Sequence, residues 1–160
     1  MADASRVSMH IDLCHLPARH ALVIHTNCPA TSVSATMRKL FADVAMWAAG
    51  HGVRLSGPAV ARYDEKADGR CVLDAGYFVD RPIAVDDADV ETLDIDDCVA
   101  VHASHVGSSE SLAATYWALE TWAQSHGYAP AGLGWEEHAP LGTPPEHAHA
   151  DVFLPVRPAA

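Results

Sequence analysis

The chain has 160 residues, of which 49% are hydrophobic and 19% are charged, so it is long enough for one domain with a substantial core. Its formal net charge of −11 argues against binding to nucleic acid and permits attraction of cations. Because no apolar run reaches the length of a membrane span, no secretory signal is visible and the four cysteines form no CxxC pair, we expect a cytoplasmic protein with reduced thiols.

The first half of the chain reads as a strand, a helix and two further strands. Residues 1–11 look like a short lead-in, with no room for a helix-turn-helix. The first apolar run is broken from Asn27 onwards, and Gly52 suits the left-handed backbone conformation that ends many helices. The expected elements are strands at 20–25, 59–63 and 71–79 and a helix at about 31–49.

The second half repeats this order after an acidic connector, residues 80–97. A loop at 107–111 is expected to begin its helix, and a turn is expected at 143–146. The expected elements are strands at 90–93, at 98–102, from Gly132 onwards and at 148–156, and a helix at about 112–125.

An internal repeat relates the two halves. The segment Trp47–Gly52 recurs as Trp122–Gly127, both ending in His-Gly, at an offset of 122 − 47 = 75 residues. The same offset pairs Tyr63 with His138. We expect Trp47 and Trp122, one turn from their helix ends, to pack in the core.

These observations predict an α+β fold of two pseudo-symmetric strand-helix-strand-strand repeats, at about 12–80 and 81–157. The repeats would share one antiparallel sheet with two helices and leave a central cleft along the pseudo-twofold axis. The expected organisation is a single domain over residues 1–160, without a DNA-binding domain.

Glu136 is the residue around which we expect the site to form. Because side chains alternate along a strand, Glu136 and His138 share one face, while Trp135 and Glu137 share the other. A carboxylate on the inner face is costly to bury unless something offsets that cost, and a ligand could do so. The alternative is an exposed strand residue, since Glu is rarely buried.

Several segments, taken in order, carry a resemblance to a known family. They are Gly57–Tyr63, Leu112, Tyr116, Leu119, Trp122, His126–Tyr128, Trp135–Glu136, Thr143–Pro145 and Asp151–Val156. Together they resemble the GyrI-like ligand-binding family, named for a gyrase inhibitor, and the effector-binding half of AraC-type and MerR-type regulators. The resemblance covers about residues 20–156.

The resemblance implies a pocket between the two halves, lined by aromatic residues, with a glutamate at its base that corresponds to Glu136. Family members commonly have a tyrosine where this chain has His138, and an Asp-Pro where it has Ala139-Pro140. A desolvated carboxylate among aromatic rings suits a planar, lipophilic cation. We therefore expect a small hydrophobic or cationic ligand.

Other aromatic residues are candidates for the pocket wall. Tyr77 and Phe78 point to opposite faces, and Tyr77 is preferred for its hydroxyl; Tyr116 and its counterpart Phe41 are core or cleft wall; Trp117 either lines the cleft or is exposed. The predicted ligand-binding residues are Glu136, Tyr63, His138, Tyr77, Tyr116, Trp117, Phe41 and Trp135.

Three functions follow as hypotheses. The first is binding of amphipathic, often cationic or toxic molecules, for sequestration, resistance or sensing. The second, which the resemblance permits, is hydrolysis of cyclopropane-containing genotoxic natural products, with Glu136 as acid or base and Tyr63 or His138 assisting. The third, implied only by the name of the family, is a partnership with DNA gyrase.

The sequence predicts no cofactor and no metal site. His102 and His105, and likewise His147 and His149, have a ligand-like spacing, but no third and fourth ligands are evident near them. Phosphate-binding loops and nucleophile elbows are also missing from the sequence.

Overall fold

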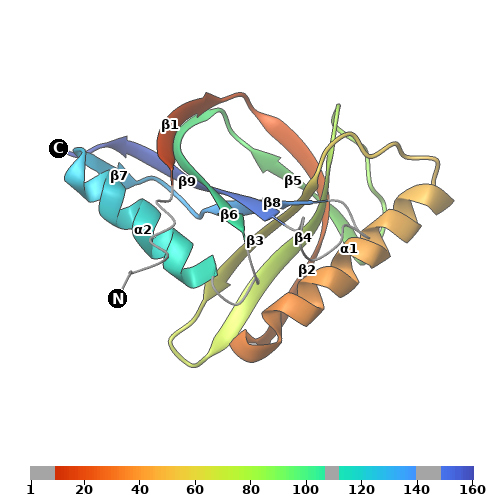
Figure 1. Cartoon of the computed structure of the whole chain (residues 1–160). Helices are drawn as coiled ribbons and strands as arrows, with labels where there is room; N and C mark the ends of the chain where they lie inside the picture. The colour runs from red at the N-terminus through yellow and green to blue at the C-terminus, as the bar shows by residue number, and fades with distance from the viewer. Residues whose placement is uncertain (1–9, 107–111, 140–148) are drawn as a thin grey trace.

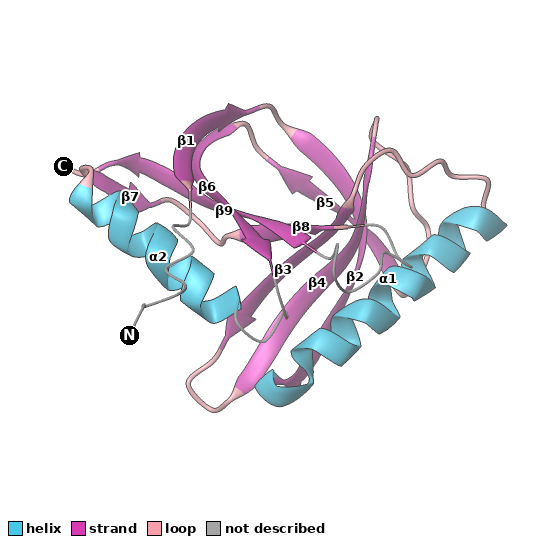
Figure 2. Cartoon of the chain, in the orientation of Figure 1, coloured by secondary structure: helices cyan, strands magenta, loops and turns pink. Residues whose placement is uncertain are grey.

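The computed structural model describes residues 10–106, 112–139 and 149–160, which form two helices and a nine-stranded antiparallel sheet (Figures 1 and 2). A single turn of 3₁₀ helix, Ala30–Ser32, precedes the first helix. The elements are β1 (Ile11–Leu16), β2 (Arg19–Pro29), α1 (Val33–Gly50), β3 (Ala59–Glu65), β4 (Arg70–Val79), β5 (Val90–Ile95), β6 (Cys98–Val106), α2 (Leu112–Ser125), β7 (Tyr128–Pro130), β8 (Trp135–His138) and β9 (His149–Pro158).

The strand order confirms the predicted pseudo-symmetry. It is β1-β6-β9-β8-β3-β4-β2-β5, with β7 paired to β9. The order reads equivalently from either end: β8 and β3 meet at the centre, and β1 and β5 lie at the two edges. The first strand of each half pairs with a strand of the other half: β1 of the first half pairs with β6, and β5 of the second half pairs with β2. The two repeats therefore form one continuous sheet.

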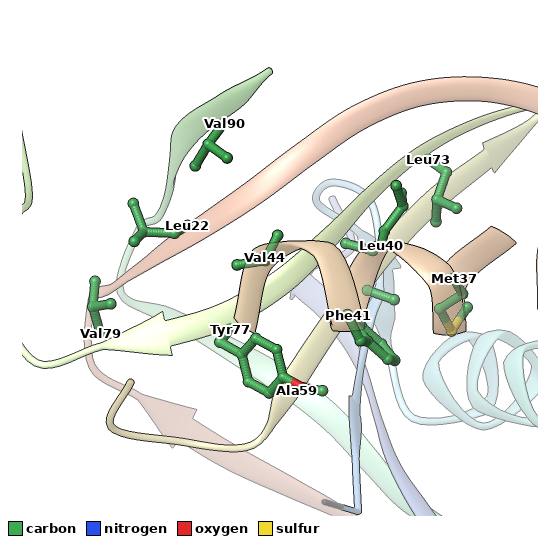
Figure 3. Close-up of a cluster of buried hydrophobic side chains, with 12 residues drawn as sticks. Leu22, Met37, Leu40, Phe41, Val44, Ala59, Leu73, Tyr77, Val79 and Val90 are labelled. Atoms are coloured by element: carbon green, nitrogen blue, oxygen red, sulfur yellow. The ribbon is translucent and has the colours of Figure 1, made fainter. Parts of the chain in front are cut away.

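Both helices cover the same face of this sheet, and each packs on the strands of its own half (Figures 1 and 2). Helix α1 buries Met37, Leu40, Phe41 and Val44 against β2, β3 and β4 (Figure 3). Helix α2 buries Leu112 and other apolar side chains against β6 and β9. Because the two hydrophobic clusters are separate, the centre of the sheet between them is left for other side chains.

The opposite face of the sheet has its own core. Trp135, Phe153 and Phe78 are buried there with alanine and valine side chains of β2, β3 and β6. The curl of the sheet explains this second core. Residues 17–18 join β1 to β2, and residues 96–97 join β5 to β6, although each pair lies at opposite ends of the strand order. These short links require the two ends to approach each other.

The two helices have equivalent aromatic contacts at their C-terminal ends. Trp47 stacks on His51 with ring centroids 4.1 Å apart, and Trp122 stacks on His126 at 3.8 Å. In both cases the histidine Nδ1 lies 2.8 Å from the carbonyl oxygen of its tryptophan, which also accepts a hydrogen bond from the backbone N–H of the same histidine at 3.1 Å. Both tryptophans pack against the core clusters but remain partly exposed, and each stacks on a histidine that is itself exposed.

Some expected boundaries were wrong. Strand β2 does not break at Asn27 but continues to Pro29, because Asn27 to Pro29 remain paired with Val72 to Arg70 of β4. Strands β1 and β7 were not predicted. The loop at 107–111 and the turn at 143–146 lie outside the described residues. None of the described helices is long and apolar enough to cross a membrane.

Candidate functional site

Glu136 lies at the centre of the sheet, on the face that carries the helices. Its register partner on the neighbouring strand β3 is Ala61. These two residues are also equivalent in the repeat, since 136 − 61 = 75. The pseudo-twofold axis therefore passes between a carboxylate and a methyl group, and the site is symmetric in backbone but charged on one side only.

The side chain of Glu136 is fully buried, with 0% of its surface exposed, and its charge is met by three neighbouring groups. The Tyr116 hydroxyl donates to Oε2 at 3.0 Å, and Nε2 of His138 lies 2.8 Å from Oε1. The Tyr63 hydroxyl also forms a hydrogen bond with this carboxylate. Among the described residues, no lysine or arginine forms an ion pair with Glu136. A buried carboxylate without a permanent cation is unusual.

Aromatic rings surround the carboxylate in a pseudo-symmetric arrangement. Phe41 of α1 contacts His138 of the second half, with centroids 5.6 Å apart. Tyr116 of α2 contacts Tyr63 of the first half edge-on at 6.1 Å. These are equivalent contacts, since 116 − 41 and 138 − 63 both equal 75. Tyr77 extends the group through Phe41, at 6.0 Å (Figure 3).

The environment keeps both tyrosines protonated, so that each hydroxyl can donate to the carboxylate. Burial and the charge of Glu136 raise the pKa of Tyr63 and of Tyr116 far above the ordinary value of a phenol, and the hydrogen bonds to Glu136 add to the effect. A phenol that stays neutral can stabilise the carboxylate without adding a second negative charge.

Gly134 is a site residue that the sequence did not reveal. A Cβ atom there would lie 2.7 Å from Cε1 of Tyr116 and 2.7 Å from the carbonyl oxygen of Phe153. The Tyr116 ring therefore lies directly on the backbone of Gly134. The Gly-Trp-Glu order, which places a residue without a side chain two positions before Glu136 on the same face, is the signal that could have indicated it.

The structure brings together six of the predicted residues and separates two. Glu136, Tyr63, His138, Tyr77, Tyr116 and Phe41 form one connected group. Trp117 is 68% exposed and does not contact this group. Trp135 is buried on the opposite face, stacked on Phe153 at 5.2 Å, with its indole donating to Glu137.

A separate hollow of about 450 Å³ lies near Trp135, away from Glu136. Arg62, Cys98 and Leu133 contribute to its lining, together with the acidic turn between β5 and β6. It is therefore distinct from the pocket around Glu136 that was predicted between the two halves.

Of the histidine pairs considered as metal ligands, His102 and His105 do not converge. His102 contacts Asp12 and Asp151 on one face of β6. His105 is three residues further along the strand, so it points to the other face, where Nδ1 meets the Thr115 hydroxyl at 2.9 Å. His147 lies outside the described residues.

Solved structures share this fold at low sequence identity. The EcmrR C-terminal domain matches with a TM-score of 0.77 and 15% identity over 96% of this chain and 100% of that one. SAV2435 bound to tetraphenylphosphonium gives 0.67 and 11% over 93% and 94%. A hydrolase from Listeria innocua gives 0.60 and 13% over 92% and 91%. The chain spans 58% of the EcmrR chain in an EcmrR–DNA complex.

No curated protein matches the sequence significantly. The family comparison is positive over almost the whole length: residues 9–157 match the GyrI-like small molecule binding domain. That match agrees with the pseudo-symmetric sheet and its two helices. The chain belongs to the GyrI-like family of small-molecule-binding domains.

Proposed function

We propose that this protein binds an amphipathic, lipophilic cation between its two helices, with Glu136 as the group that neutralises the charge. The observation that carries the proposal is that the Glu136 carboxylate is fully buried and that its partners are three neutral or titratable groups. Among the described residues, no lysine or arginine pairs with it. A cation that replaces one of these partners would satisfy Glu136 better than the partner does.

The surrounding rings fit such a guest. Aromatic faces attract cations electrostatically, and they contribute apolar contact area to a lipophilic body at the same time. Because Glu136 is fully covered, the guest must displace a side chain; His138, whose side chain is 18% exposed, is the partner nearest to solvent. The structural neighbour SAV2435 is bound to tetraphenylphosphonium, a cation of this class.

Isothermal titration calorimetry with tetraphenylphosphonium tests this proposal. We expect Glu136→Gln to weaken binding about 10- to 100-fold, because it removes the charge and keeps the shape. The matched control is Glu137→Gln: Glu137 is the next residue in the chain, but it faces Arg19 and Trp135 on the opposite side of the sheet. We expect its affinity to stay near that of the wild type.

A second ligand separates charge from shape. Tetraphenylborate has the same form as tetraphenylphosphonium and the opposite charge, so we expect it to bind far more weakly to the wild type. Circular dichroism spectra of both variants check that they fold. Equal affinity of Glu136→Gln and the wild type for the cation, or equal binding of the two ions, would overturn the proposal.

A second candidate function is hydrolysis of cyclopropane-containing genotoxic compounds. The observation that favours it is the contact between the buried carboxylate of Glu136 and the ring of His138, whose Nε2 lies 2.8 Å from Oε1, because a carboxylate and an imidazole at hydrogen-bond distance suit acid–base chemistry. Water would add across one strained C–C bond, with its oxygen joining one carbon and its proton going to the other.

Mass spectrometry distinguishes turnover from sequestration. Incubation of excess compound with the protein should yield the hydrated product in amounts above one equivalent if the protein is an enzyme, and Glu136→Gln should abolish that turnover. Protection of the compound in a one-to-one complex, without product, supports sequestration or sensing. The gyrase partnership stays a prediction, for which a supercoiling assay is the measurement.

A further inference from the structure

A second cluster of chemically active side chains lies on the face of the sheet opposite to the helices. It consists of His25 on β2, Asp74 on β4 and Glu91 on β5, whose nearest ligand atoms all lie within 4.8 Å of one another. We propose that these three residues form a binding site for a divalent transition-metal ion of the Zn²⁺ class. This site is separate from Glu136 and independent of the function proposed there.

The sheet itself places the three side chains. His25 and Asp74 are direct partners across β2 and β4. Glu91 is paired with Val23, two residues before His25 on the same strand, so it projects from the same face. Three adjacent strands, β4, β2 and β5, therefore hold the ligands on a rigid backbone.

The donor atoms suit this class of ion. One imidazole nitrogen and two carboxylate oxygens are ligands that Zn²⁺ accepts at about 2.0–2.2 Å, with water in the remaining positions. His25 and Glu91 are exposed, which gives the ion a path from solvent. The other oxygen of Asp74 meets Nη2 of Arg62 at 3.4 Å, a contact that orients the carboxylate from outside the site.

Two other histidines that contact carboxylates, His102 and His20, lack the convergence seen at His25. At His25, Nδ1 lies 2.7 Å from Asp74 and faces the point where Glu91 also converges. His102 uses both ring nitrogens, one for Asp12 and the other for Asp151, so its two carboxylates lie on opposite sides of the ring. His20 pairs with Asp94 at 2.7 Å and belongs to no such group of three among the described residues.

Calorimetric titration of the chelator-treated, full-length protein with Zn²⁺ tests the site. We expect one binding event that His25→Ala abolishes and that Glu91→Gln weakens by more than about tenfold, because losing a ligand costs more than losing an outer-shell partner. His20→Ala is the matched control: it removes an exposed histidine–aspartate pair from the same strand and should leave this event unchanged. Co²⁺ provides a second readout, a visible absorption band that His25→Ala removes.

His25 and Glu91 are both exposed, so the His25→Ala and Glu91→Gln variants should fold, and circular dichroism verifies this. Absence of Zn²⁺ binding by the wild type would overturn the proposal, as would binding that His25→Ala and Glu91→Gln leave unchanged. Glu136→Gln, by contrast, should bind Zn²⁺ like the wild type. Failure of the metal site therefore has no bearing on the proposed cation site.

Discussion

Tyr116 can reach Glu136 because the residue beneath its ring has no side chain. The ring lies on the backbone of Gly134, and the carbonyl oxygen of Phe153 closes the same space from the neighbouring strand. The hydroxyl is thereby fixed 3.0 Å from the buried carboxylate. Its repeat equivalent, Phe41, has no hydroxyl, which matches the absence of a carboxylate at the equivalent position, Ala61. The second half of the pseudo-symmetric site thus supplies the carboxylate from β8 and a phenol from α2, whereas the first half supplies only the phenol of Tyr63 from β3.

Gly134→Ala should therefore lower the stability of the fold and also disturb the hydrogen bond from Tyr116 to Glu136. The new methyl group cannot move the Phe153 backbone easily, so it must displace the Tyr116 ring and the hydroxyl from Glu136. We expect a loss of about 1–3 kcal/mol in the free energy of unfolding, measured by urea denaturation, as for other overpacked sites. Gly50→Ala is the control, since a Cβ there meets nothing within 4 Å. A Gly134→Ala variant as stable as Gly50→Ala would contradict this account of the site.

At the scale of elements, His102 of β6 ties an edge strand and a central strand together. Its Nδ1 lies 2.9 Å from Asp12 of β1, and its Nε2 lies 2.9 Å from Asp151 of β9. Burial disfavours the charged ring, but the hydrogen bonds and charges of Asp151 and Asp12 outweigh that cost and raise the pKa of His102 above its usual value. Burial likewise opposes ionisation of Asp151, yet the hydrogen bonds from His102 and Ser104 lower its pKa. The protonated ring of His102 therefore helps to hold edge strand β1 against the rest of the sheet.

This tie should make stability depend on pH. The raised pKa of His102 means that its contribution is complete below about pH 6.5, the value in an unfolded chain, and is lost as the pH rises through the folded pKa. We expect the wild type to lose about 1 kcal/mol more than His102→Gln between pH 5 and pH 9 in urea denaturation, a modest value because the carboxylates are partly exposed. If the free energy of unfolding changes with pH by the same amount in both proteins, the charge of His102 does not stabilise the contact between β1, β6 and β9.

At the scale of the whole molecule, the repeat in the sequence made the fold predictable. The helix at 112–125 and the inward direction of Glu136 and His138 follow from periodicity and from the offset of 75 residues. The curl of the sheet does not, because local periodicity carries no information about how its two ends meet. Trp135 was assigned to the pocket although strand alternation places it on the face opposite Glu136, and on that face it lies in the second core.

Other features also escaped the sequence because they depend on contacts between distant segments. Strand β1 is short and finds its partner, β6, only in the other half of the chain. His25, Asp74 and Glu91 lie 74 − 25 = 49 and 91 − 74 = 17 positions apart in the sequence and meet only through the strand register. Trp117 follows Tyr116 in sequence, but one step around the helix turns it from the site to solvent.

The central position of the site predicts that a ligand should stabilise the entire fold. Glu136 lies where the two halves meet, and its neighbours come from α2 of one half and from β3 of the other. A cation held there contacts both halves only in the folded state. At a concentration of 100 times Kd, it should add about 2.7 kcal/mol to the free energy of unfolding, which raises Tm by about 5–10 °C in a domain of this size. Differential scanning calorimetry with tetraphenylphosphonium measures the shift. Glu136→Gln should show little of it, while His25→Ala should show all of it; an equal shift in Glu136→Gln would mean that the cation stabilises the protein from another surface.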